Sequence, residues 1–365
     1  MISEKCFTQD WLDTFKKQKE HKSIQSNILE KMIYALHLVE QLKIEGLDFV
    51  LKGGTSLVLL LEEGNRFSID IDIVCSEKRE KLESILGEVV GKSRFKNVGL
   101  DEKRSYKSGI PKAHYLFQFD SVFNIKSPAH IILDVLIEDS IYPCTIESPI
   151  QTKWIESDSK TTVTTPSIDS IAGDKLTAFA PNTIGIPYFK SGNLSTMEIC
   201  KQLFDLGRLF DRVQNVEIVA NSFYVHAEQE IKYRENEEKF KDLTPEKVLW
   251  DVIETCLIIT KRERNEDKGD KEKFQSLQRG IVSFGSGYLM SGKFRIDDAI
   301  VAAAKVAHLA AKIMANDFTN MEYYQEQDIK DLEIGNSDWS YLNRLKRQPE
   351  KSSFYYWFQT IKLIT

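Results

Sequence analysis

The sequence predicts an α/β (α+β) N-terminal domain with a mixed sheet, followed by a mostly α-helical C-terminal domain. Over the first 150 residues, short apolar runs typical of strands alternate with amphipathic segments, and from about residue 215 helical periodicity dominates. A chain of 365 residues is long enough for one or two domains. We therefore expect a first domain over residues 1–150 and a second over residues 151–365.

The elements of the first domain follow from apolar spacing and from turn residues. Apolar residues at helical spacing predict helices over 27–42, 55–63 and 79–90, the second of which ends at Gly64-Asn65. Buried-type runs predict strands over 47–52, 67–75 and 129–138. The segments 95–106 and 112–122, joined by the turn "KSGIP", are typical of an antiparallel hairpin.

The second domain begins with a helix start signal. Thr-Pro-Ser at 165–167 opens the segment "IDSIAGDKLTAFA", and a long helix follows over 196–213. The clearest later helix is "IDDAIVAAAKVAHLAAKIM". We interpret the aromatic run "SFYYWF" near the C-terminus as a packed helix or strand. The charged run "TKRERNEDKGDKEKF" is predicted to be a surface turn or linker, because its acidic and basic residues roughly balance.

Composition narrows the class of protein. The net charge is −6, so binding to a polyanion would need a local basic patch, for example one including Lys107, Lys112, Lys126 and Lys190. Five widely spaced cysteines without a C-x-x-C pair indicate reduced thiols. The polar N-terminus has no signal-peptide core, and no apolar run is long enough for a bilayer. We expect a cytoplasmic protein with no membrane partner.

Two aspartates in an otherwise apolar strand are the first candidates for chemistry. Asp70 and Asp72 alternate with Ile69, Ile71 and Ile73, so their carboxylates point to the same face, roughly 7 Å apart along the strand. Burying carboxylates is costly unless a cation or several donors compensate them. Mg²⁺ prefers such oxygen ligands, with Mn²⁺ as the alternative ion. Asp134, the only acid in "HIILDVLI", could supply a third carboxylate if its strand neighbours this one.

Gly53-Gly54 provides a second candidate feature. A strand that runs into a glycine pair and then a helix lets a ligand approach the backbone, and free N–H groups of the first turn can bind phosphate. Thr55 or Ser56 could add a hydroxyl contact or simply cap the helix. A glycine pair is more often only a tight turn, and a D-x-D often lies on a solvated strand face. Their order and strand context together favour a site for a metal and a nucleoside triphosphate (NTP).

Four motifs carry a family resemblance. In order, "LKGGTSL", "RFSIDIDI", "AGDKLTAF" and "KQLFDLGRL" resemble the motifs of the AbiEii/AbiGii-type nucleotidyltransferases. These are toxin components of type IV toxin–antitoxin and abortive-infection systems, within the DNA polymerase β-like (minimal nucleotidyltransferase) superfamily. The resemblance covers roughly residues 30–215, and its specificity comes from the order of the motifs.

The resemblance implies a role for each matching residue. It implies that Gly53 and Gly54 hold the triphosphate, with Thr55 and Ser68 beside them, and that Asp70 and Asp72 bind the metal. Lys175 would contact the triphosphate or position the reacting groups, and Asp205 would be a further essential acid. Asp134 lies where the wider superfamily can carry a third metal ligand. The implied catalytic set is Asp70, Asp72, Lys175 and Asp205.

Lys175 and Asp205, the two candidate residues of the second domain, could also have purely structural roles. Lysines are usually solvated, so Lys175 could be a surface residue. Asp205 lies among apolar neighbours and could form a structural ion pair with Lys201, four residues earlier on the same helix. In addition, many family members have a basic–acidic pair where this chain has Lys201-Gln202, which leaves the role of Lys201 open.

The function that we predict is transfer of a nucleoside monophosphate (NMP) from an NTP to an acceptor hydroxyl, with release of pyrophosphate. The resemblance favours a tRNA 3′ end as the acceptor, and it implies a cognate antitoxin as a possible partner chain. It also implies that the helical domain closes the catalytic cleft. The alternatives are NMP transfer to a protein or a small molecule, and a non-catalytic module that binds an antitoxin. A sugar-nucleotide transferase with a D-x-D motif is a weaker alternative.

Overall fold

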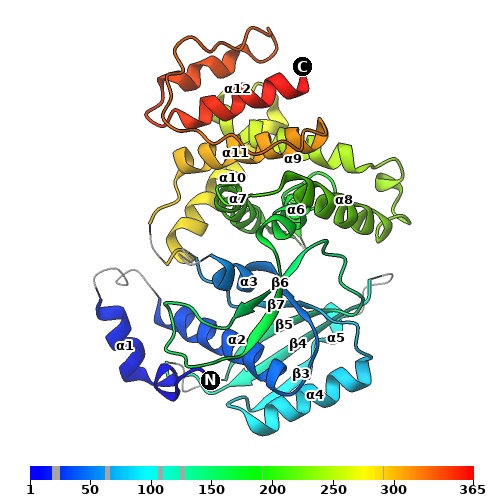
Figure 1. Cartoon of the computed structure of the whole chain (residues 1–365), viewed down its shortest axis with the longest axis vertical. Helices are drawn as coiled ribbons and strands as arrows, with labels where there is room; N and C mark the ends of the chain where they lie inside the picture. Colours follow the sequence, from blue (N-terminus) through cyan, green and yellow to red (C-terminus); the bar gives the residue numbers. More distant parts are fainter. Residues whose placement is uncertain (19–24, 62–65, 106–109, 124–127, 191, 291) are drawn as a thin grey trace. The chain divides into compact units, whose positions relative to one another are not determined.

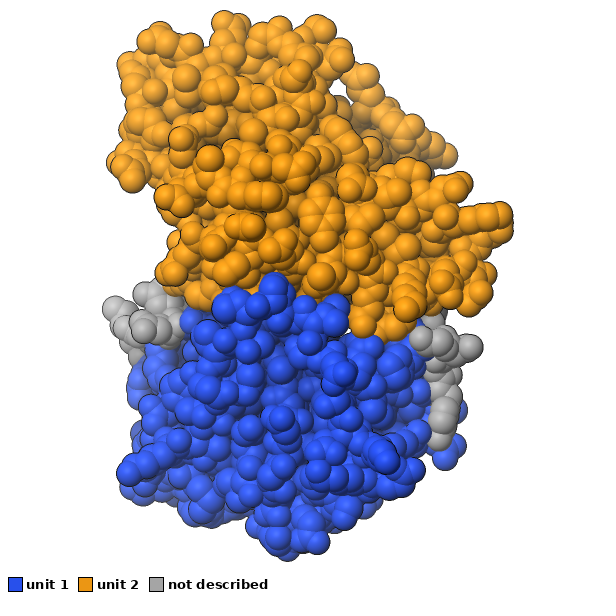
Figure 2. Space-filling model, turned by 45° about the vertical axis from the view of Figure 1, so that its right-hand side comes forward, with its two compact units in different colours: residues 1–167, 287–292 blue, residues 168–286, 293–365 orange. Residues whose placement is uncertain are grey.

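The computed structural model divides the chain into two compact units (Figures 1 and 2). It describes residues 1–18, 25–61, 66–105, 110–123, 128–190, 192–290 and 292–365. Unit 1 contains Met1–Ser167 together with Gly287–Gly292, and unit 2 contains Ile168–Ser286 together with Lys293–Thr365. The predicted boundary at residue 150 falls between two paired strands of unit 1.

Unit 1 is built on a mixed seven-stranded sheet (Figure 1), as the sequence predicts. The strands are β1 (Val50–Lys52), β2 (Ile71–Val74), β3 (Asn97–Leu100), β4 (Lys112–Phe119), β5 (Ala129–Leu136), β6 (Thr145–Pro149) and β7 (Thr162–Pro166). Their order in the sheet is β3-β4-β5-β2-β1-β7-β6. The pairs β2–β5 and β1–β7 are parallel, whereas β1–β2, β3–β4, β4–β5 and β6–β7 are antiparallel.

The helices of unit 1 include those predicted over 27–42, 55–63 and 79–90, together with two that were not predicted. They are α1 (Gln9–Lys17), α2 (Ser26–Ile44), α3 (Gly53–Leu60), α4 (Arg79–Lys92) and the short α5 (Glu102–Ser105). The predicted hairpin exists as β3 and β4, with α5 between them. Strand β2 is shorter than predicted, and β6 and β7 were not predicted. The final residues of the predicted helix 55–63, the break at 64–65 and most of "KSGIP" lie outside the described residues.

Strand alternation separates the sheet into an apolar face and a mixed face. On one face, alternate residues such as Ile71, Ile73 and Leu133 are almost fully buried and share one core with the apolar residues of α2 and α4. The intervening residues, including Asp72 and Asp134, project to the other face and are only partly buried. This alternation explains how a strand rich in isoleucine accommodates carboxylates.

A distant segment completes unit 1. The backbone N–H of Phe67 donates to the carbonyl of Tyr288 at 2.9 Å, and Arg66 and Leu289 form an isolated antiparallel bridge. Tyr288 and Leu289 therefore hold the segment that leads into β2, although they follow a helix that lies mainly in unit 2.

Unit 2 is mainly helical. Its helices are α6 (Ile168–Ala178), α7 (Thr196–Phe210), α8 (Val216–Lys232), α9 (Pro245–Lys261), α10 (Lys268–Gly287), α11 (Ile296–Met314) and α12 (Ser352–Ile364). A small hairpin of β8 (Phe189–Lys190) and β9 (Asn193–Leu194) precedes α7. The alanine-rich α11 packs against α7, α8, α9 and α12, since small side chains allow helices to approach closely.

Two predictions about unit 2 have clear outcomes. The aromatic run near the C-terminus forms α12, with Phe354, Tyr355, Tyr356 and Trp357 buried, which confirms the packed-helix interpretation. The charged run 260–274 is more ordered than the predicted linker. It contains the end of α9, a short 3-10 turn (Arg262–Arg264) and the first residues of α10.

Candidate active site

The start of α3 is pressed against the Asp72 carboxylate. Gly53 has φ +71°, in the left-handed region that favours glycine, and a Cβ at this position would lie 2.3 Å from Oδ2 of Asp72. Because glycine has no side chain, the Asp72 carboxylate occupies the space that a Cβ at residue 53 would fill. Because α3 begins at Gly53, its first N–H groups have no acceptor within the helix. This juxtaposition combines an acid with a backbone that is able to bind an anion.

Gly54 makes room for a different part of the chain, the residues just before β2. A Cβ on Gly54 would lie 2.6 Å from Ser68 Oγ and 2.7 Å from an Arg66 guanidinium nitrogen. The glycine pair thus allows the residues just before β2 to approach the helix start. Arg66 also donates to the carbonyl of Phe67 at 3.0 Å. The structure brings Gly53, Gly54, Ser68 and Asp72 into one place.

Thr55 and Ser56 are completely buried and bonded within the fold. The Thr55 hydroxyl is 2.6 Å from the Asp70 carbonyl and 3.0 Å from Ser68 Oγ. The Ser56 hydroxyl donates to the Gly53 carbonyl at 2.9 Å. Thr55 therefore fastens α3 to the segment that carries Asp70, and any contact of its own with an NTP stays a prediction.

Asp70 lies one residue before β2, and its side chain is exposed. Asp72 lies inside the strand and is partly buried. The two acids of the D-x-D therefore differ in environment, with one anchored beside Gly53 and the other facing solvent within unit 1. Carboxylate oxygens are the ligands that Mg²⁺ prefers, so the donor types here fit a hard divalent ion. Asp70 and Asp72 are the residues that would hold it.

A polar row crosses four strands on the mixed face of the sheet. Register places Lys52 of β1 opposite Asp72 of β2, Asp72 beside Asp134 of β5, and Asp134 opposite His114 of β4. Because paired residues share a face, the four side chains project to the same side. The parallel pairing of β2 and β5 fulfils the condition that the sequence set for Asp134, namely that its strand neighbours the D-x-D strand.

Asp134 is nevertheless engaged by other groups. His114 Nδ1 bonds to its Oδ1, and Arg104 lies 3.8 Å from its Oδ2. Among the residues that the structure describes, no three His, Cys, Asp or Glu side chains are grouped so that they could hold one metal ion. The three-carboxylate cluster is thus not formed, and metal binding by Asp134 remains a prediction. Sequence reasoning missed Lys52 and His114, which strand register brings to this row, and Arg104, which the short helix α5 places beside Asp134.

Lys175 and Asp205 form a buried ion pair inside unit 2. Lys175 Nζ lies 2.8 Å from Asp205 Oδ2, and their side chains are only 6% and 3% exposed. The same Nζ donates to Gln202 Oε1 at 2.9 Å. Helix α6 carries the lysine, and α7 carries its two partners. The surface-lysine alternative for Lys175 is wrong, and the residue Gln202, which departs from the family pattern, is part of this cluster.

Of the four lysines considered for a basic patch, Lys107 and Lys126 lie outside the described residues. Lys112 is partly buried on β4, and Lys190 is exposed on β8. They lie in different units, and a basic patch that includes them stays a prediction.

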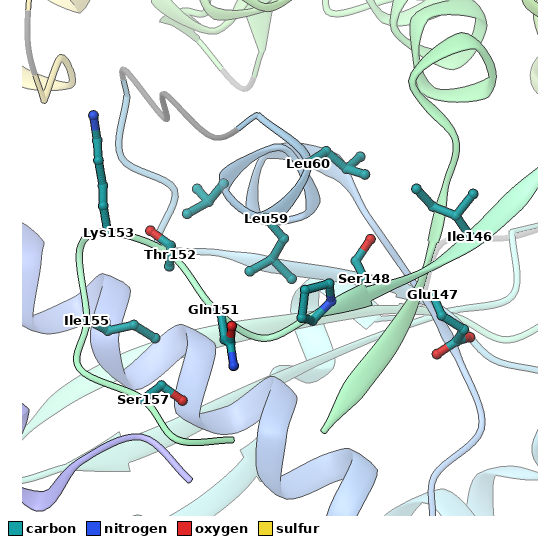
Figure 3. Close-up of a pocket in the computed structure, with 12 residues that line it drawn as sticks. Leu59, Leu60, Ile146, Glu147, Ser148, Gln151, Thr152, Lys153, Ile155 and Ser157 are labelled. Atoms are coloured by element: carbon teal, nitrogen blue, oxygen red, sulfur yellow. The ribbon is translucent and has the colours of Figure 1, made fainter. Parts of the chain in front are cut away.

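A cavity of about 620 Å³ opens beside the far end of α3 in unit 1 (Figure 3). Aliphatic residues Leu59, Leu60 and Ile155 line it together with small polar residues. The acid on its wall, Glu147, is already bonded, because its carboxylate accepts from the hydroxyls of Thr162 and Thr164, which lowers its pKa. This cavity lacks the paired acids of the Gly53–Asp72 region, so we do not assign the chemistry to it.

Comparison with known proteins identifies the family of the chain. Residues 38–287 match the model of the family described as "Nucleotidyl transferase AbiEii toxin, Type IV TA system". This match, which covers more than half of the chain, shows that the protein is a nucleotidyltransferase. The chain belongs to the AbiEii toxin family of type IV toxin–antitoxin systems. Membership implies an NTP substrate and a cognate antitoxin.

Two solved structures are similar to parts of the chain. One is a protein from H. pylori assigned as a nucleotidyltransferase, with 17% identity, a TM-score of 0.35, and coverage of 70% of this chain and 96% of that chain. The other is the nucleotidyltransferase toxin MenT4 from Mycobacterium tuberculosis H37Rv, with 12% identity, a TM-score of 0.41, and coverage of 83% and 98%. No curated protein sequence matches the chain. In the part of the chain that the structure describes, no helix has the length and apolarity needed to cross a membrane.

Proposed function

We propose that this toxin transfers NMP from an NTP to the 3′-terminal hydroxyl of tRNA, with Mg²⁺ bound by Asp70 and Asp72. The observation that carries the proposal is the Asp72 carboxylate seated in the space left by Gly53, at the start of α3. The family supports an NTP and a divalent metal, and the tRNA acceptor rests on the motif resemblance.

The transfer requires one bond to form and one to break. The acceptor oxygen bonds to the α-phosphorus, the bond from that phosphorus to the α–β bridging oxygen breaks, and pyrophosphate leaves with the electron pair. A bound Mg²⁺ would supply charge neutralisation for the phosphates and acidify the acceptor hydroxyl. The first N–H groups of α3 would bind phosphate oxygens, Asp134 is our candidate third carboxylate for the metal, and the proton of the acceptor hydroxyl would pass to water.

The roles proposed for unit 2 are more limited. Lys175 would place positive charge toward the triphosphate, and Asp205 with Gln202 would hold its ammonium group in position. Because both side chains of the ion pair are nearly inaccessible, we expect Asp205 to position Lys175.

The test is a labelling assay with a matched control. The protein is mixed with Mg²⁺, total tRNA and each α-phosphate-labelled NTP in turn, and Asp72→Asn is compared with Asp13→Asn, a change at a partly buried acid of α1. We expect label in tRNA with the unmodified protein and Asp13→Asn. For Asp72→Asn we expect a loss of about 1,000-fold, which corresponds to about 4 kcal/mol of transition-state stabilisation.

Two further arms separate the finer claims. Periodate oxidation of tRNA destroys its 3′-terminal hydroxyl and should abolish labelling, whereas persistence of label would move the acceptor elsewhere on the RNA. Chelation of divalent ions should also abolish it. Label that enters protein while tRNA stays unlabelled would replace the tRNA acceptor with a side chain and leave nucleotidyltransfer intact.

A further inference from the structure

A strongly basic pocket lies in unit 2, at the end of α9. It has a volume of about 400 Å³ and is lined by Thr260, Lys261, Arg262, Glu263, Arg264, Arg344, Arg347 and Gln348. Five of these residues are cationic and one is anionic, in a chain whose net charge is −6. Its volume falls within the range typical of ligand pockets, roughly 300–1,000 Å³.

The cations are held together by specific contacts. Arg344 donates to the carbonyls of Thr260 and Lys261 at 3.1 and 3.3 Å, which satisfies the last turn of α9. Lys261 and Arg344 both lie near the Tyr341 ring, at 4.9 and 5.9 Å from its centroid. These contacts fix positive charges on one wall of the pocket.

The charge of this cluster is only partly compensated. Arg262 pairs with Asp297, but its Nε is buried and has no hydrogen-bond partner. Burial lowers the pKa of Arg344, and the nearby positive charges of Arg264 and Arg262 lower it further. If Asp297 and Glu263 are set against the five cations, a net charge of +3 remains (5 − 2). Positive charges that line one pocket repel each other, so an anion bound in the pocket would relieve the repulsion.

Two arginines stand at the exposed part of the pocket. Arg264 and Arg347 are exposed, and within the described residues neither forms a hydrogen bond or an ion pair by its side chain. Guanidinium groups bind phosphate through two parallel N–H bonds. Arginines in contact with solvent beside fixed interior cations suit a phosphate that is part of a longer chain more than a small enclosed anion.

We propose that this pocket binds backbone phosphates of the RNA acceptor. The proposal rests on the proposed function for the nature of the acceptor, and it assigns to unit 2 a site for holding RNA that is separate from the Lys175–Asp205 pair. The pocket would supply the local concentration of positive charge that an acidic protein needs to hold a polyanion.

The test compares two charge-matched double variants by fluorescence anisotropy of labelled tRNA over a salt titration, without NTP. Arg264→Gln with Arg347→Gln removes two pocket charges. Lys271→Gln with Arg279→Gln removes two exposed charges of α10 that do not line the pocket. We expect the pocket variant to bind about tenfold more weakly, with a log–log salt slope shallower by about 1–2. The α10 variant should behave like the unmodified protein.

Calorimetric titrations with inorganic phosphate and with NTP test whether the pocket binds a small phosphate-containing molecule in place of RNA. If the pocket variant loses binding of either small anion while RNA binding is unchanged, or if both double variants bind RNA equally, the proposal is overturned. A transfer assay under the same conditions separates this from the proposed function. If RNA binding depends on the pocket but no transfer occurs, the proposed tRNA nucleotidyltransfer is wrong and the RNA-binding site stands. If transfer occurs and its KM for RNA does not depend on the pocket, the proposed function stands and the RNA-binding site is wrong.

Discussion

Replacing Gly53 with alanine would test whether the start of α3 sets the position of the Asp72 carboxylate. An L-residue with the φ of +71° found at Gly53 pays about 1–2 kcal/mol for the left-handed conformation. The added Cβ would lie 2.3 Å from Asp72 Oδ2, and ordinary contact begins at 3.4 Å, so the carboxylate must retreat by about 1.1 Å (3.4 − 2.3). A displacement of about 1 Å at a reacting centre can cost about 100-fold in rate.

Gly46→Ala is the matched control for this variant. Gly46 has φ +82°, but a Cβ there would meet no atom within 4 Å. Both variants therefore pay the backbone cost, and each should lower the melting temperature by about 2–4 °C per kcal/mol lost. Only Gly53→Ala should also lose about 100-fold in NMP transfer. Equal activities for the two variants would refute the steric argument.

A double-mutant cycle tests whether the Asp72 carboxylate is the group that clashes with the new methyl group of Gly53→Ala. In an Asp72→Ala background the carboxylate is gone, and only the Cβ contact of 3.2 Å remains. Gly53→Ala should then destabilise unit 1 less than it does beside Asp72, and the difference, measured by urea unfolding, is the steric part of its cost. If Gly53→Ala costs the same in both backgrounds, the carboxylate is not what the new methyl group meets.

Three further predictions follow from buried polar groups. Lys175→Met should cost about 3–5 kcal/mol by leaving the Asp205 carboxylate buried without its ammonium partner, and Lys175→Met with Asp205→Leu should recover most of that stability in urea unfolding without restoring transfer. Burial lowers the pKa of His37 to about 4, so the unfolded chain protonates first below pH 6.5. Unfolding free energy should fall by up to about 3 kcal/mol between pH 6.5 and 4, and His37→Phe should remove this share, which urea unfolding at both pH values would detect. Thr55→Val removes a buried hydroxyl 2.6 Å from the Asp70 carbonyl, which should cost about 1–3 kcal/mol by thermal unfolding; an unchanged melting temperature would contradict it.

Local sequence patterns predicted most of the elements around the candidate site. The apolar run before Gly53-Gly54, the helix after it and the strand with Asp72 are all recognisable from periods of two and 3.6 residues. Strands β6 and β7 were missed because they are short, and their pairing brings together residues that are only moderately apolar. Such strands are stabilised by their neighbours in the sheet, and this information is absent from a local window.

The sequence by itself determined which residues are candidates for the chemistry, because the glycine pair, the D-x-D and the later lysine and aspartate motifs are each read within a few residues. The tertiary structure alone decided how they meet. Only the parallel pairing of β2 with β5 places Asp134 beside Asp72, and only the antiparallel pairing with β4 gives Asp134 its His114 partner. Only the packing of α6 on α7 makes Lys175 a buried partner of Asp205. These contacts join residues far apart in the chain, and their energies depend on burial and register, which no short stretch of sequence encodes.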